Sequence, residues 1–150
     1  FNTPGRIKDI SGAFMETSNP TQLNLSPIGE VKTDVKKPPR HWSVSEATGT
    51  LILDQGYTPG LLGIKPEDEI VVLFWFNRSA PFTSELLQQQ PPHLGGERRG
   101  VFATCSPKRP NPVGMSILKV IAIDSNRIEV TGIDMHDGTP ILDIKPNVKP

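Results

Sequence analysis

The sequence predicts a mainly β fold: a small closed or partly open β-barrel of about seven short strands with little helix. Two observations favour this fold. A chain of 150 residues is of the usual size for one core. Short apolar runs also alternate along it with turns rich in proline and glycine, of which there are 16 and 13. Their sum stays below the roughly 25–30% typical of disordered chains, so many turns between short strands is the better interpretation.

The N-terminal segment differs from the rest of the chain. Residues 1–21 show neither the period of a strand nor that of a helix, so we interpret them as an N-terminal arm. Residues 22–150 form the predicted barrel domain. Its first strand covers residues 22–33, with a kink at Pro27 and Gly29.

The later strands are predicted from apolar runs and the turns that bound them. The run at 70–76 (IVVLFWF) is unbroken and predicts a strand buried on both faces. The other expected strands are 50–53, 100–104, 115–123, 127–133 and 139–145. Residues 124–126 form the predicted hairpin turn. One helical turn is expected within 57–69, and residues 79–98 fit either a helix or a strand.

Charge and cysteine content narrow the function. Lys plus Arg and Asp plus Glu number 16 each, so no overall field attracts nucleic acid or an anionic membrane, and RNA binding requires a local patch. The longest apolar run is far short of the roughly 20 residues that cross a bilayer. The single cysteine, Cys105, excludes an internal disulfide and a Cys-pair zinc site. We expect a cytoplasmic protein without membrane or metal.

Two proline-rich segments predict loops. Residues 36–42 (KKPPRHW) cannot form a strand interior, because proline removes a donor and fixes φ. Residues 106–114 (SPKRPNPVG) hold three prolines and form a stiff loop that loses little entropy when a ligand binds. Lys108, Arg109 and Asn111 would present donors to a substrate or RNA from it. A plain connection between two strands is the alternative.

Two long motifs resemble a known family. GVFATCSPKRPNPVGMS (100–116) and GIDMHDGTPILDIKP (132–146) closely resemble the paired signatures of the TsaA/TrmO-like family, and LSPIGEVKT (25–33) and the strand leading to Asn77 and Arg78 fit its pattern. The resemblance implies a small β-barrel, usually a homodimer, that binds S-adenosylmethionine. It also implies methylation of N6 of threonylcarbamoyladenosine 37 in tRNA. The lack of a G-x-G-x-x-G loop agrees with a fold unlike Rossmann-type methyltransferases.

The resemblance also implies which residues contact the cofactor. Matching positions lie in a loop, at a strand end and in a turn: Pro39, Arg40, His41, Asn77, Arg78, Cys105, Met115, Ile133, Asp134, Met135 and His136. A sulfonium is attracted by oxygens and aromatic faces, adenine needs an apolar slot, and the amino-acid tail needs paired charges. Met115 would line the adenine slot or be plain core. Asp134 would bind the ammonium or the ribose, or only stabilise its turn.

Methyl transfer from a sulfonium is an in-line displacement, so alignment supplies most of the catalysis. The acceptor nitrogen is urea-like, and removing its proton would help. We expect Asp137 to be the base or an orienting group, and Lys145 to stabilise charge on the substrate; the alternative for Asp137 is an ordinary turn residue beside Gly138. Basic side chains that would contact RNA phosphates are Lys108, Arg109, Arg98, Arg99, Lys36, Lys37 and Arg40.

The chain departs from the family signature at two positions. Members commonly have arginine in place of Cys105 and tyrosine in place of Asn147. Arginine holds a carboxylate through two parallel hydrogen bonds, and a thiol cannot. Two alternatives therefore stand beside the tRNA methyltransferase: an S-adenosylmethionine-binding module without turnover, and a methyltransferase with a different acceptor.

Overall fold

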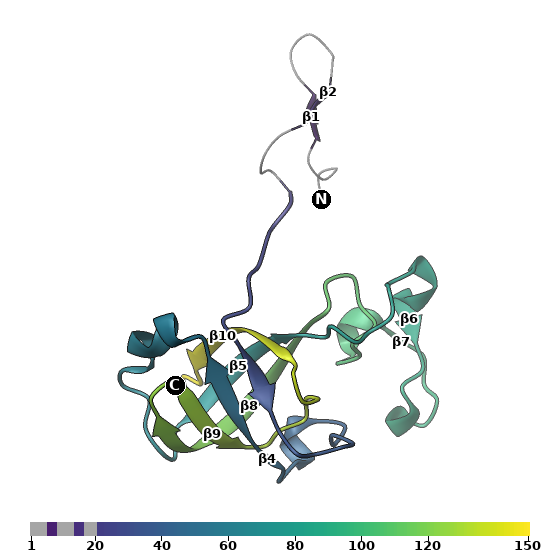
Figure 1. Cartoon of the computed structure of the whole chain (residues 1–150). Helices are drawn as coiled ribbons and strands as arrows, with labels where there is room; N and C mark the ends of the chain where they lie inside the picture. The colour runs from purple at the N-terminus through teal and green to yellow at the C-terminus, as the bar shows by residue number, and fades with distance from the viewer. Residues whose placement is uncertain (1–5, 9–13, 17–20) are drawn as a thin grey trace.

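The structure, a computed structural model, describes residues 6–8, 14–16 and 21–150. In this part of the chain, antiparallel strands close into a barrel in the order β10-β3-β4-β9-β8-β5 (Figure 1). These strands are β3 (Gly29–Lys32), β4 (Thr48–Leu53), β5 (Glu69–Trp75), β8 (Val113–Asp124), β9 (Arg127–Thr131) and β10 (Pro140–Pro146). The predicted small β-barrel is confirmed.

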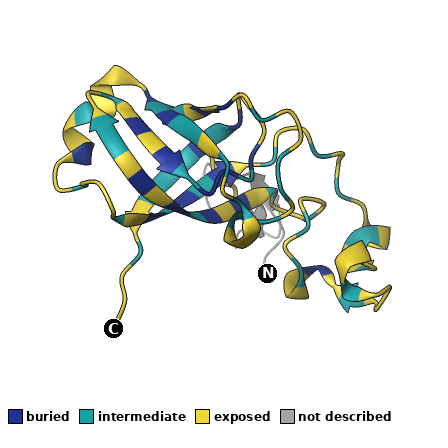
Figure 2. Ribbon diagram, turned by 90° about the horizontal axis from the view of Figure 1, so that it is seen from below, coloured by how far each residue is buried: buried dark blue, intermediate teal, exposed yellow. Residues whose placement is uncertain are grey.

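The barrel interior is filled by one face of each strand. Along β5 burial alternates, with Ile70, Val72 and Phe74 buried between more exposed neighbours. Figure 2 shows the same alternation of dark and light bands along the other strands. Val31 of β3 and Leu51 of β4, paired directly across the sheet, are both fully buried. In a small closed barrel, inward-facing side chains alternate with outward-facing ones along each strand, and the inward-facing aliphatic side chains form the core.

A long excursion leaves the barrel between β5 and β8 and lies beside it (Figure 1). It contains the 3-10 helices η3 (Ser84–Leu87), η4 (Pro92–Leu94) and η5 (Val101–Ala103), and a two-stranded ribbon of β6 (Gln88–Gln89) and β7 (Arg99–Gly100). The segment 79–98 therefore holds both a helical turn and a strand. Two further 3-10 helices, η1 (Trp42–Val44) and η2 (Gln55–Leu61), lie in the loops after β3 and β4.

The hairpin turn and the last strand are as predicted. β8 and β9 form the hairpin, and Ser125 adopts a positive φ of 55° in its turn. Gly138 has a φ of 82° just before β10, a conformation that glycine adopts without steric penalty. The helical turn expected within 57–69 corresponds to η2.

Three strand predictions were wrong in part. Only Gly29–Lys32 of residues 22–33 is a strand, and Leu23 and Leu25 are exposed. The run at 70–76 is buried on one face, because a closed barrel leaves the other face of β5 outward. Residues 101–103 form η5 instead of a strand. Only Val101 of this helix is buried, and Phe102 is 79% exposed.

The expected arm, residues 1–21, lies mostly outside the described residues. Of it the structure describes Thr21 and two short strands, β1 (Arg6–Lys8) and β2 (Phe14–Glu16), which pair with each other. The division into an arm and a domain from residue 22 stays a prediction. Among the described residues no helix is long and apolar enough to cross a membrane.

Candidate functional site

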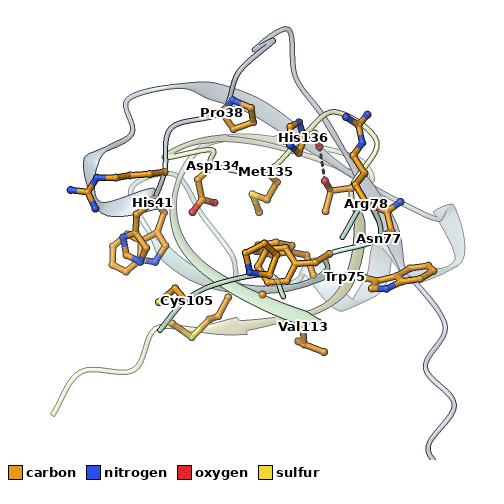
Figure 3. Close-up of a pocket in the computed structure, with 18 of the residues that line it drawn as sticks. Pro38, His41, Trp75, Asn77, Arg78, Cys105, Val113, Asp134, Met135 and His136 are labelled. Carbon is orange, nitrogen blue, oxygen red and sulfur yellow. Dashed lines mark hydrogen bonds between the residues drawn. The ribbon is translucent and has the colours of Figure 1, made fainter. Parts of the chain in front are cut away.

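A cavity of about 650 Å³ opens at one end of the barrel (Figure 3). It lies where β5 ends and β8 begins, and the loop after β3 and the turn before β10 complete its wall. Its volume falls within the roughly 300–1,000 Å³ of small-molecule sites. We call it the first cavity.

Asp134 is the carboxylate of the first cavity. Its Oδ1 accepts a hydrogen bond of 2.6 Å from Oγ of Ser116, a β8 residue that is fully buried. Burial raises the pKa of the Asp134 carboxyl above its usual value, opposed by the hydrogen bonds from Ser116 and from the backbone of Trp42 and by the nearby His41. A carboxylate with a raised pKa in a cleft is typical of functional sites. Figure 3 shows Asp134 and Met135 inside the ring of lining side chains.

Trp42, which also lines this cavity, holds a buried donor without a partner. Among the described residues, its indole Nε1 is the buried side-chain polar atom that has no hydrogen-bond partner. The ring of His41 lies against it, with centroids 4.9 Å apart. A buried donor without an acceptor costs about 1–3 kcal/mol.

Aromatic rings and a glycine shape the inner end of the first cavity. Phe74 and Phe76 pack edge to face, with centroids 5.1 Å apart. A Cβ at Gly114 would overlap both rings, so the backbone of β8 approaches them closely only because residue 114 has no side chain. Both rings belong to the wall that Asp134 also lines.

Cationic side chains surround the polar part of the first cavity. Lys37, Arg40, Arg78 and Arg109 all line it, whereas Asp134 is the acidic residue among the described residues of its wall. Arg109 also stiffens the predicted proline-rich loop, because its guanidinium donates to the carbonyls of Thr104 and Ser106 at 3.0 Å each. The cavity thus offers one half-buried carboxylate and several cations.

The structure brings most of the predicted cofactor residues together. The predicted residues that line the first cavity are Pro39, Arg40, His41, Asn77, Arg78, Cys105, Met115, Asp134, Met135 and His136. Arg109, predicted to contact the substrate, lines it as well. The cofactor role of these residues stays a prediction, but their convergence from five separate stretches of the chain is a fact of the fold.

Other predicted residues lie elsewhere. Ile133 is fully buried in the core and does not line the first cavity. The carboxylate of Asp137 accepts a 3.0 Å hydrogen bond from the Thr33 backbone and lies 3.8 Å from Lys32 Nζ.

Lys145 Nζ lies 2.9 Å from the Asp143 carboxylate. It is four residues, or about 13 Å of strand, beyond Ile141 in β10. Neither Lys145 nor Asn111 lines the first cavity, and Lys108 lines a neighbouring one.

Sequence reasoning missed Trp42, Phe74 and Phe76 as site residues. Trp42 ends the KKPPRHW loop, where a large aromatic after a basic, proline-rich run was a usable signal. Phe74 and Phe76 carried no such signal, since an apolar strand predicts core.

Within the described residues, no group of three or more His, Cys, Asp or Glu side chains could hold a metal ion.

Comparison with known proteins agrees with this geometry. The family model for the tRNA-methyltransferase O N-terminal domain matches residues 28–150. The chain is 36% identical over 124 residues to an S-adenosyl-L-methionine-binding protein of Archaeoglobus fulgidus, covering 81% of this chain and 86% of that one. It is 38% identical over 88 residues to a tRNA (adenine(37)-N6)-methyltransferase of Mus musculus, covering 59% of this chain and 20% of that one.

Solved structures show the same barrel. The crystal structure of TrmO from Pseudomonas aeruginosa superposes with a TM-score of 0.67 at 30% identity, covering 85% of this chain. This chain spans 57% of that one. From the family match, the archaeal relative and the shared fold, we conclude that the chain belongs to the tRNA-methyltransferase O N-terminal domain family.

Proposed function

We propose that the chain binds S-adenosylmethionine in the first cavity and transfers its methyl group to N6 of adenosine 37 in tRNA, in the form of threonylcarbamoyladenosine. The observation that carries this proposal is a half-buried carboxylate, Asp134, in a cavity whose wall also holds aromatic rings and several cationic side chains. A cationic ligand would pair with this carboxylate. The names of the archaeal and mammalian relatives support the same cofactor and reaction.

The residues present fit the cofactor. The Asp134 carboxylate would face the sulfonium or the ammonium, and the rings of Phe74 and Phe76 would offer their faces to the apolar parts. Arg40 and Arg78 would hold the carboxylate of the amino-acid tail. Arginines at the rim therefore supply the paired charge that a thiol at Cys105 does not.

The cofactor supplies an electrophilic methyl group bound to a positively charged sulfur. In the transfer, the sulfur–carbon bond breaks, a nitrogen–carbon bond forms at N6, and the N6 proton leaves. The protein's contribution is to align the two atoms and to exclude water from them. Asp137 as the base and Lys145 as a charge-stabilising group stay predictions, and both already hold structural partners, Thr33 and Asp143.

A binding module without turnover is the second candidate. The observation in its favour is that Asp137 and Lys145, the predicted catalytic residues, do not line the first cavity. A methyltransferase with another acceptor is the third. A homodimer and a cytoplasmic location likewise stay predictions for this protein.

The deciding experiment measures methyl incorporation. The purified chain is incubated with S-adenosylmethionine labelled in its methyl group and with tRNA that either carries or lacks threonylcarbamoyladenosine. We expect label only in the modified tRNA, and an N6-methylated nucleoside in its digest by mass spectrometry. Cofactor binding without label in either tRNA would favour the module, and label in both would favour a different acceptor.

The Asp137→Asn variant tests the proposed base. Asn keeps the oxygen that accepts from Thr33, so the fold is retained while the proton acceptor is lost. Asp54→Asn is the matched control, because Asp54 is exposed and its side chain makes no capping bond. Full activity of Asp137→Asn, with an unchanged melting temperature, would remove Asp137 from the mechanism.

A further inference from the structure

A second cavity of about 760 Å³ adjoins the first. Most of its wall comes from the excursion, with the η3–β6–η4 segment on one side and residues 103–108 on the other, and Arg40 and His41 of the loop after β3 complete it. Arg40, His41, Thr104, Cys105 and Pro107 line both cavities, so the two cavities adjoin at these residues.

The second cavity is cationic. Arg40, Arg99 and Lys108 line it, and no Asp or Glu does among the described residues of its wall. Arg99 has one partner outside the cavity, Glu97, at 3.3 Å. Three permanent cations without a lining carboxylate favour an anionic occupant, such as a phosphate of an RNA backbone or a carboxylate.

The opposite wall carries groups that suit a nucleobase. Gln88 and Gln90 expose side-chain amides, and an amide presents the donor and acceptor pair that matches an adenine edge. Between them, Gln89 holds the two walls together, because its Nε2 donates to the carbonyls of Leu86 and Lys108 at 2.8 and 2.7 Å. The shape of the second cavity is therefore fixed by protein contacts.

We propose that the second cavity binds the acceptor nucleotide. The base, turned out of the RNA stack, lies against the Gln88–Gln90 wall, and the phosphate or carboxylate of the nucleotide lies on Arg99 and Lys108. The methyl donor and the acceptor nitrogen then meet where the two cavities adjoin, beside Thr104 and Cys105. This inference rests on the proposed function, and it adds the site at which the substrate is held. Enzymes that act on a base hold it in a pocket outside the stack.

The test compares two hairpin RNAs that differ at one loop position, which is either adenosine or abasic. We expect the wild-type chain to bind the adenosine RNA about tenfold more tightly, since one amide–adenine pair discriminates by about that much. The Ala103→Trp variant fills the second cavity and should bind both RNAs equally, because Ala103 is exposed and lines only that cavity. Ala80→Trp, at an exposed alanine that lines neither cavity, is the matched control and should keep the difference.

A charge variant checks the inference without adding bulk. Arg99→Gln with Lys108→Gln should weaken binding of the adenosine RNA about tenfold. Lys65→Gln with Lys119→Gln removes the same net charge from exposed ion pairs outside both cavities and should change binding less than twofold.

Cofactor binding separates the two claims. We expect every variant to bind S-adenosylmethionine as the wild type does in calorimetric titration, because none of the substituted residues lines the first cavity. The inference is overturned if the wild type binds both RNAs equally, or if Ala103→Trp keeps the adenosine preference while folded. A wild type that shows the preference but takes up no S-adenosylmethionine would instead overturn the proposed function and leave the second cavity as a nucleotide site.

Discussion

Replacing Asp134 by asparagine separates ligand binding from folding. The carboxylate is partly buried, and burial raises its pKa above the usual 3.8. Asparagine has the same shape and keeps an oxygen that accepts from Ser116, whose hydroxyl lies 2.6 Å away. The substitution therefore removes the negative charge and leaves the packing in place.

The effect on stability follows from the direction of the pKa shift. Between pH 3.8 and the raised pKa, the folded protein holds a proton that the unfolded chain releases, so the free energy of unfolding falls as the pH rises through this window. At neutral pH the ionised carboxylate is thus a net destabilising group. We expect Asp134→Asn to unfold at the same temperature as the wild type or higher.

The effect on binding has the opposite sign. A hydrogen bond or contact to a charged partner contributes about 1.5–3 kcal/mol, and about 1.4 kcal/mol corresponds to a factor of ten. The variant should therefore bind S-adenosylmethionine roughly 10–100-fold more weakly at neutral pH. S-adenosylhomocysteine, which lacks the sulfonium charge, should lose much less affinity if the carboxylate faces the sulfur.

Calorimetric titrations of both proteins with both ligands, repeated across pH, check this reasoning. Wild-type affinity for S-adenosylmethionine should decline as the pH is lowered through the raised pKa of Asp134, because the carboxylate gains a proton. The variant's affinity should stay flat over the same range. An unchanged affinity in Asp134→Asn, or a clear loss of thermal stability, would refute the account of this residue.

Two further substitutions test the wall of the first cavity. Gly114→Ala should lower the free energy of unfolding in urea by about 1–3 kcal/mol, since the new Cβ displaces the rings of Phe74 and Phe76; wild-type stability would show that these rings move freely. Ser116→Ala should lower the free energy of unfolding by about 1 kcal/mol. It also removes a hydrogen bond that lowers the pKa of Asp134, so S-adenosylmethionine binding should already be lost at a higher pH than in the wild type. A pH profile of binding identical to that of the wild type would contradict this coupling.

Strand prediction succeeded where the local pattern alone decides the structure. β8 and β9 combine apolar alternation with a tight turn at Asp124–Asn126, and both signals are local. It failed at residues 100–104, where a strand-like run leaves the barrel and Phe102 is exposed to solvent. Whether such a run finds a partner strand depends on tertiary pairing, which the local pattern does not contain.

The site was predictable mainly through motif resemblance. Residues as far apart as His41 and His136 meet at one end of the barrel because β3 and β10 are neighbours, which only the closed strand order reveals. The contact between Thr33 and Asp137, 104 residues apart in sequence, arises from the same pairing and gives Asp137 a partner that its DG turn did not indicate. The position of Trp42 after a basic, proline-rich run was a usable signal, but its unpaired indole donor is visible only in three dimensions.

The most direct test of the central claim, S-adenosylmethionine in the first cavity, follows the indole N–H signals of the protein during a titration with the cofactor. The chain has two tryptophans, so two signals are expected, and a Trp75→Phe variant assigns them. Both tryptophans line the first cavity, but Trp75 is 44% exposed, whereas the Trp42 donor is buried without an acceptor. We predict a saturable shift of the Trp42 signal at one cofactor per chain; a Trp42 signal that does not move at saturating S-adenosylmethionine would contradict the account.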